Sequence, residues 1–129
     1  MKGYLKVKDD IYWVGALDFD IRTFDVVMYT EYGTTYNSYI VKGSEKAALI
    51  EAAKDKFFEE HLERIKGITN LEKIDYLIVN HTEPDHTGAI ERLLDINPDM
   101  TIVGSSFAIK FLKEITNKEF NSKIVKDGE

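Results

Sequence analysis

The sequence contains no cysteine among its 129 residues. This absence excludes disulfide bonds, thiolate nucleophiles, and iron–sulfur or zinc sites that are built on cysteine. Any metal ion that the chain holds must therefore have nitrogen and oxygen ligands. A chain without cysteine is also consistent with a cytoplasmic location, which is the location that we expect.

Long hydrophobic runs and an excess of positive charge are missing as well. No apolar stretch reaches the ~20 residues that a membrane-spanning helix needs. The N-terminal residues lead into alternating, strand-like sequence rather than into the apolar block of a signal peptide. The 17 basic and 23 acidic residues give a net charge of −6. Because proteins that bind nucleic acids or anionic membranes are normally basic, we expect neither partner.

The pattern along the chain changes from strands to alternating helices and strands. We expect strands over residues 4–7, 11–14, 34–41, 47–50, 75–79, 101–103 and 123–126. Helices are expected between residues 57 and 67 and between residues 90 and 97, and a third helix is expected to begin at residue 105 or 106. In the last helix, Ser105 or Ser106 would be the N-cap, and the buried stripe would consist of Ala108, Phe111, Leu112 and Ile115. This order predicts one α/β domain with helices on a mixed sheet.

Four potential metal ligands lie within six residues, between a predicted buried strand and a predicted helix. They are His81, Glu83, Asp85 and His86. In extended chain, His81 and Glu83 point to the same side, whereas the consecutive Asp85 and His86 diverge. One pair can therefore bind one ion while the other pair binds a neighbouring ion, and Pro84 stiffens the connection between the pairs.

Two interpretations of this segment stay open. A polar loop before a helix often holds an aspartate or threonine only as a cap, and Asp85 or Thr87 could do no more than that. Metal binding is the interpretation that we favour, because His, Glu, Asp and His seldom occur together at such a junction by chance. Two imidazoles and two carboxylates suit iron, manganese or zinc, and the carboxylate of Glu83 favours iron or manganese.

Other residues have a structural and a functional interpretation. Thr35 and Asn37 either support the metal loop through hydrogen bonds or belong to a plain turn. For Trp13, Tyr36 and Tyr39 we expect packing in the core rather than a partner surface. The C-terminal lysines are expected to form a solvated face; they are Lys110, Lys113, Lys118, Lys123 and Lys126.

The pattern His81-x-Glu83-x-Asp85-His86 resembles that of the flavodiiron proteins, also called A-type flavoproteins. The ordinary metallo-β-lactamase pattern has a histidine in place of Glu83. Further similarity lies in residues 33–39 and 74–80. The resemblance implies that residues 1–129 are the N-terminal half of a metallo-β-lactamase-like αββα sandwich, an α/β fold, and that no flavodoxin-like domain is present.

The resemblance also implies a function. His81 and Glu83 would bind one iron, Asp85 and His86 the other, and a carboxylate from elsewhere would bridge the two. Members of this family are oxidoreductases that reduce dioxygen to water, nitric oxide to nitrous oxide, or both. Their electrons come from an FMN in a following domain, and they usually work as head-to-tail homodimers.

By the same resemblance, two further histidines and the bridging aspartate lie downstream of the matching region. We therefore expect weak or absent metal binding and no turnover from residues 1–129 alone. The remaining histidine, His61, falls on a predicted amphipathic helix, where we expect a packing or surface role. Half a sandwich would leave an apolar sheet face that a homodimer could cover. A metallo-β-lactamase-type hydrolase, which Glu83 speaks against, and a non-catalytic dimerising module remain as alternatives.

Overall fold

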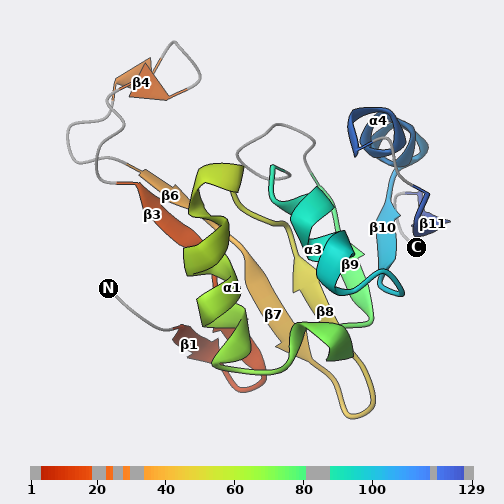
Figure 1. The fold of residues 1–129 in the computed structure, drawn as a ribbon. Coiled ribbons are helices and arrows are strands. Elements are labelled where there is room, and N and C mark those ends of the chain that lie inside the picture. The colour runs from red at the N-terminus through yellow and green to blue at the C-terminus, as the bar shows by residue number, and fades with distance from the viewer. Residues whose placement is uncertain are drawn as a thin grey trace.

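The computed structural model describes residues 4–18, 23–24, 28–29, 34–80, 88–116 and 119–126. A seven-stranded mixed sheet with the order β1-β2-β7-β8-β9-β10-β11 forms its centre (Figure 1). The strands are β1 (Leu5–Lys8), β2 (Ile11–Trp13), β7 (Tyr39–Lys42), β8 (Ala47–Ile50), β9 (Tyr76–Ile78), β10 (Thr101–Gly104) and β11 (Asn121–Ile124). Two small sheets join β3 (Ala16–Asp18) with β6 (Thr34–Tyr36), and β4 (Thr23–Phe24) with β5 (Met28–Tyr29).

The main sheet has an antiparallel half and a parallel half. Strands β1, β2, β7 and β8 pair antiparallel through short connections. Strands β8, β9, β10 and β11 pair parallel. The connections between the parallel strands carry the helical elements, which are η1 (Asp55–Phe57), α1 (Phe58–Lys66), η2 (Leu71–Lys73), α3 (Ile90–Ile96) and α4 (Ser106–Thr116). Because parallel strands end at the same edge, the residues that follow β8, β9 and β10 lie near one another.

The two faces of the main sheet differ in how they are covered. One row of paired residues across β7, β8, β9 and β10 is fully buried; it consists of Ile40, Leu49, Leu77 and Ile102. They belong to one core cluster with the apolar residues of α1, α3 and α4, so the helices cover this face (Figure 1). On the opposite face, a row of apolar side chains is only half-buried; it consists of Tyr39, Ile50, Ile78 and Val103. A second such row consists of Val41, Ala48 and Tyr76. We call these two rows the open face.

The prediction of one strand over residues 34–41 is wrong, because this stretch forms two strands that belong to two different sheets. β6 pairs with β3, and β7 enters the main sheet. The chain changes sheets at Ser38, whose carbonyl accepts the Val14 N–H and whose Oγ donates to the Glu51 carbonyl over 2.8 Å. Those bonds replace ladder bonds at the break. The last strand also starts and ends two residues earlier than expected, at Asn121 and Ile124.

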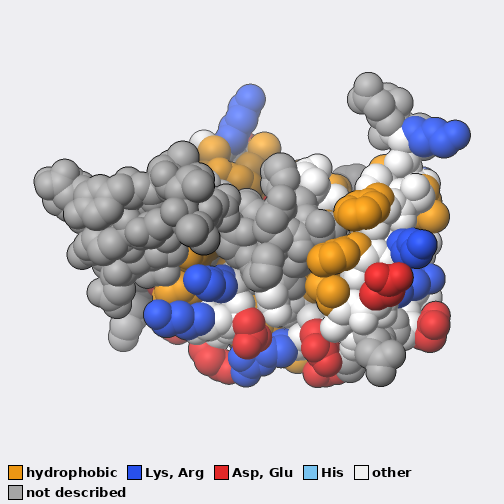
Figure 2. Space-filling view, turned by 90° about the horizontal axis from the view of Figure 1, so that it is seen from above, with side chains coloured by type: hydrophobic (Ala, Val, Ile, Leu, Met, Phe, Trp, Pro, Cys, Tyr) orange, Lys and Arg blue, Asp and Glu red, His pale blue; other side chains and the backbone are white. Residues whose placement is uncertain are grey.

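Helix α4 begins as predicted but presents a different face to the core. The Ser105 Oγ accepts the Ala108 N–H over 3.1 Å, which confirms the serine cap. Ala108 and Leu112 are buried as expected, but Ile109 is buried too and Ile115 is 51% exposed. Phe107, Ile115 and Ile124 are exposed apolar residues of this region, and Figure 2 shows such side chains gathered among charged ones on that side of the molecule. The described lysines of the expected solvated face are all exposed.

Candidate metal centre

The four predicted ligands, His81, Glu83, Asp85 and His86, lie outside the described residues, but both ends of their segment are described. The segment follows β9 and precedes α3, as the sequence predicts for a strand-to-helix connection at the carboxyl edge of the sheet. The pairing of β9 with β10 continues past the strand, because the Val79 N–H donates to the Val103 carbonyl over 2.9 Å. The start of the segment is thereby tied to the parallel half of the sheet.

One short stretch after β8 contacts both ends of the segment that carries the ligands. The N–H of Asn80, the residue before His81, donates to the Oε1 of Glu51. At the other end, the N–H of Ala89 donates to the carbonyl of Ala53 over 3.1 Å. Residues 51 to 53 therefore fix where the segment leaves the sheet and where it enters α3.

Glu51 is held in an unusual backbone conformation. Its φ of 62° lies in the left-handed region, which is uncommon for a residue with a long side chain. Its N–H donates to the Ile78 carbonyl over 2.9 Å, and its carbonyl accepts from the Ser38 Oγ. The side chain is buried, with 6% of its residue surface exposed. These contacts aim the carboxylate at the end of β9.

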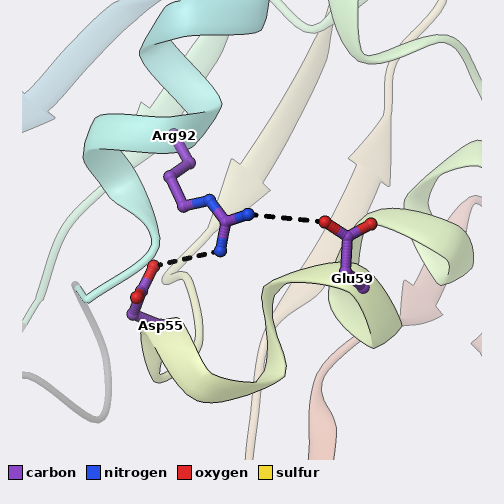
Figure 3. Close-up of polar contacts among 3 residues, drawn as sticks. All are labelled: Asp55, Glu59 and Arg92. Atoms are coloured by element: carbon purple, nitrogen blue, oxygen red, sulfur yellow. Dashed lines mark hydrogen bonds and ion pairs between the residues drawn. The ribbon is translucent and has the colours of Figure 1, made fainter.

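One arginine of helix α3 contacts η1 and the first turn of α1 (Figure 3). Arg92 lies 3.5 Å from the Asp55 carboxylate and 3.4 Å from the Glu59 carboxylate, measured from its two terminal nitrogens. Its guanidinium carbon also lies 4.2 Å from the centre of the Phe58 ring. Exposed ion pairs of this length contribute little free energy. Their geometry nevertheless orients the helix that begins three residues after the segment.

Asn37, for which support of the metal loop and a plain turn role were both open, has another partner. The Asn37 Oδ1 accepts the Trp13 Nε1–H over 3.0 Å, which favours the turn interpretation for Asn37. The side chain of Thr35 lies outside the described residues. Trp13 and Tyr36 are buried, as expected for core aromatics, and Tyr39 is half-buried on the open face.

His61 has the packing role that the sequence predicts. It is fully buried, and its Nδ1–H donates to the Val14 carbonyl over 2.7 Å. Burial lowers the pKa of His61 to about 4; the Val14 bond opposes this and the Arg64 charge adds to it. Arg64, one turn further along α1, donates to the Gly15 carbonyl over 2.8 Å and pairs with Glu60 over 2.7 Å. The neutral imidazole and the guanidinium thus hold α1 on the residues that follow β2.

Sequence reasoning missed Glu51 and Ser38. A signal for Glu51 was present, because a carboxylate directly after the apolar strand β8 lies at the same sheet edge as the motif. No comparable signal marks Ser38, because its role depends on the break between β6 and β7. Within the described ranges, no three His, Asp or Glu side chains come together as a metal site. In the same ranges, no helix is long and apolar enough to cross a membrane.

The donor set of the motif fits iron. Two imidazoles and two carboxylates without a thiolate are the ligands of non-haem iron and manganese sites. Hydrogen bonds also fix the chain on both sides of these donors, to Glu51 before them and to Ala53 after them. A segment held at both ends loses less conformational entropy on binding an ion than a free one does.

Known proteins resemble this chain in sequence and in fold. Residues 34–129 match the family model described as "ODP family beta lactamase". The chain is 46% identical over 115 residues to the flavo-diiron protein FprA2 of Clostridium acetobutylicum. The matched stretch covers 89% of the chain and 28% of that relative. Among solved structures, the rubredoxin oxygen:oxidoreductase of Desulfovibrio gigas has a TM-score of 0.90 and 34% identity over 98% of the chain. The flavodiiron protein of Giardia intestinalis has a TM-score of 0.91 and 29% identity over the whole chain.

These comparisons confirm the predicted fold class and the resemblance to flavodiiron proteins. The mixed sheet with helices on one face matches their β-lactamase-like core. The chain spans about 28% of the length of FprA2 and about 31% of each of the two solved chains.

Proposed function

Because this chain belongs to the ODP β-lactamase family, we propose that it is the N-terminal, iron-binding portion of a flavodiiron-type oxidoreductase. In this proposal residues 1–129 are half of a metallo-β-lactamase-like domain, and the protein works in the cytoplasm. The observation that supports it most directly is the position of the motif, between β9 and α3 at the carboxyl edge of parallel strands.

His81 and Glu83 would hold one iron, and Asp85 and His86 the other. When bound, a di-iron centre supplies electrons to dioxygen or nitric oxide. The chain contributes the ligands, the fixed ends of their segment and the apolar strand beneath it. An FMN in a further domain would be the electron donor, and the remaining ligands would come from outside residues 1–129. The chain by itself therefore binds iron weakly and does not turn over.

A chimera tests this function. The chain replaces the corresponding segment of FprA2 from Clostridium acetobutylicum. The chimera is prepared anaerobically and loaded with iron, and its consumption of dioxygen and of nitric oxide is then measured. We expect the chimera to keep the activity of FprA2 and its Glu83→Ala variant to lose at least 90% of it, together with about one iron per chain.

The exposed Glu91 of α3 provides the control, because Glu91→Ala removes a carboxylate outside the motif. Equal iron content and equal activity in the Glu83→Ala and Glu91→Ala chimeras would contradict the proposal. The hydrolase alternative predicts the opposite metal preference, with zinc retained and iron lost. Elemental analysis of the same samples separates the two.

The open face supports a second proposal, that the chain forms homodimers. Two rows of half-buried apolar side chains cross four strands on the side of the sheet away from the helices. Large exposed apolar patches are rare on monomers, because water contact with them costs free energy. A second copy would cover this face. The same surface supports the alternative of a non-catalytic dimerising module, which the chimera would exclude if it is active.

A further inference from the structure

We propose that Glu51 is a positioning residue that sets the conformation of the metal-binding segment. It would act through the hydrogen bond to Asn80 and would not touch the metal or the substrate. The metal-related part of this inference rests on the proposed function, whereas the hydrogen bond can be tested without any metal.

The first argument is the place of the hydrogen bond. The Glu51 carboxylate accepts the N–H of Asn80, which directly precedes the first predicted ligand, His81. Beyond Val79 the ladder bonds of β9 have ended, so this bond determines the direction in which the chain leaves the sheet. A small rotation at Asn80 would move His81 and Glu83 together.

The second argument is the cost of placing a carboxylate there. Glu51 is buried at the end of an apolar strand, where an uncharged side chain would lose less hydration free energy. Its backbone adopts a φ of 62°, a conformation that glycine or asparagine would adopt with less strain. Strained backbone conformations cluster at functional sites, and here one coincides with a buried carboxyl group.

The third argument is that Glu51 is itself held in place. Its N–H donates to Ile78 in β9, and its carbonyl accepts from the Ser38 Oγ beside β7. The carboxylate is therefore presented by three neighbouring strands rather than by a mobile loop. A residue held this way can hold another, as the partners of metal ligands commonly do.

The experiment compares Glu51→Gln with Glu51→Met in the full chain. Glutamine keeps an acceptor oxygen at about the same reach, whereas methionine has a similar length and no comparable acceptor. Amide hydrogen exchange is measured at Asn80 and at core-strand amides such as Leu77. We expect Asn80 exchange to rise at least tenfold relative to Leu77 in Glu51→Met and to stay within threefold in Glu51→Gln.

Cobalt(II) binding, followed by its visible absorption, gives the second measurement. If the segment is positioned by Glu51, affinity falls about 10- to 100-fold in Glu51→Met and recovers to within threefold in Glu51→Gln. Glu45→Met is the matched control, because Glu45 is exposed at the opposite end of the β7–β8 hairpin. A purely structural role would raise exchange at Leu77 and Asn80 alike.

Three outcomes overturn the inference: equal exchange at Asn80 in Glu51→Met and the unaltered chain, parallel loss of protection throughout the sheet, or failure of Glu51→Gln to restore protection. If Glu51→Met does not fold, Glu51→Gln decides, since loss of Asn80 protection in that variant overturns the inference and retention supports it. If no sample binds cobalt, the exchange result alone decides on Glu51, and the proposed function is decided separately by the chimera, in which the remaining ligands are present.

Discussion

At the scale of single residues, buried polar groups of α1 carry much of the specificity of the fold. His61 donates to Val14, and Arg64 donates to Gly15 while its guanidinium carbon lies 5.0 Å from the centre of the Trp13 ring. Each bond satisfies a backbone carbonyl where the chain leaves the main sheet for β3. The hydrogen bond to Val14 requires the proton of His61 on Nδ1, and burial keeps the imidazole neutral.

This arrangement predicts an acid-sensitive fold. The pKa of His61 is about 4 in the folded chain against 6.5 for a free histidine, so the unfolded chain binds the extra proton between those pH values. Stability should therefore be full above pH 6.5 and fall by about 3 kcal/mol as the pH drops to 4. Urea unfolding at several pH values measures this. In His61→Gln, which can still donate to Val14, the loss of stability between pH 6.5 and pH 4 should be smaller by this amount. An unchanged dependence of stability on pH would show that other groups cause the loss.

At the scale of elements, the junction between the main sheet and the small β3–β6 sheet depends on Gly15. A Cβ added at Gly15 would lie 2.0 Å from the Tyr36 carbonyl oxygen and 3.0 Å from the Ser38 nitrogen. Both neighbours are backbone atoms: Tyr36 lies in β6, which pairs with β3, and Ser38 lies at the break between β6 and β7, where its carbonyl accepts the Val14 N–H. Neither can move without breaking these contacts. The close approach of two backbones is therefore possible only with glycine at this position.

Gly15→Ala should destabilise the chain by about 3 kcal/mol, because the added methyl group overlaps fixed backbone. Gly67→Ala is the control, since the nearest atoms there belong to the exposed side chain of Tyr4, which can turn away. Thermal unfolding followed by circular dichroism measures both variants. Similar midpoints for Gly15→Ala and Gly67→Ala would show that the junction yields more easily than its contacts indicate.

The elements also show what the sequence could and could not predict. The helix at residues 58–66 follows a helical periodicity and the strand at 76–78 a short apolar run, and both signals are local, so their prediction is correct. The break at Ser38 is not local, because it is made by partners from Val14 and Glu51. The face of α4 depends on its position over β10, which explains why Ile109 is buried and Ile115, expected in the stripe, is exposed. The link between Glu51 and the candidate site consists of its backbone φ and its hydrogen bond to Asn80, and neither can be read from the sequence.

At the scale of the whole molecule, the two faces of the sheet are unequal. Ile40, Leu49, Leu77 and Ile102 lie beneath helices and have no exposed surface. On the other side, Ile50 and Ile78 keep part of their apolar surface in water. Covering this open face with a second copy would gain hydrophobic free energy in proportion to the apolar area removed from water.

A charge on the open face should therefore change the oligomeric state. We expect the unaltered chain to sediment as a dimer and Ile50→Lys to sediment as a folded monomer. Ile124→Lys serves as the control, because Ile124 is already 55% exposed on the edge strand β11. Analytical ultracentrifugation measures all three, with circular dichroism to verify folding. A well-folded monomer from the unaltered chain would contradict the homodimer.

The charges on the two border strands of the sheet bear on whether copies of this chain can join into fibres. An unpaired border strand is a template on which foreign strands add, and it is the usual start of amyloid-like growth. β1 carries Lys6 and Lys8, and β11 carries Lys123, all with exposed side chains. Repulsion between these cations disfavours lengthening of the sheet from copy to copy, so we expect copies to associate through the open face rather than through the border strands.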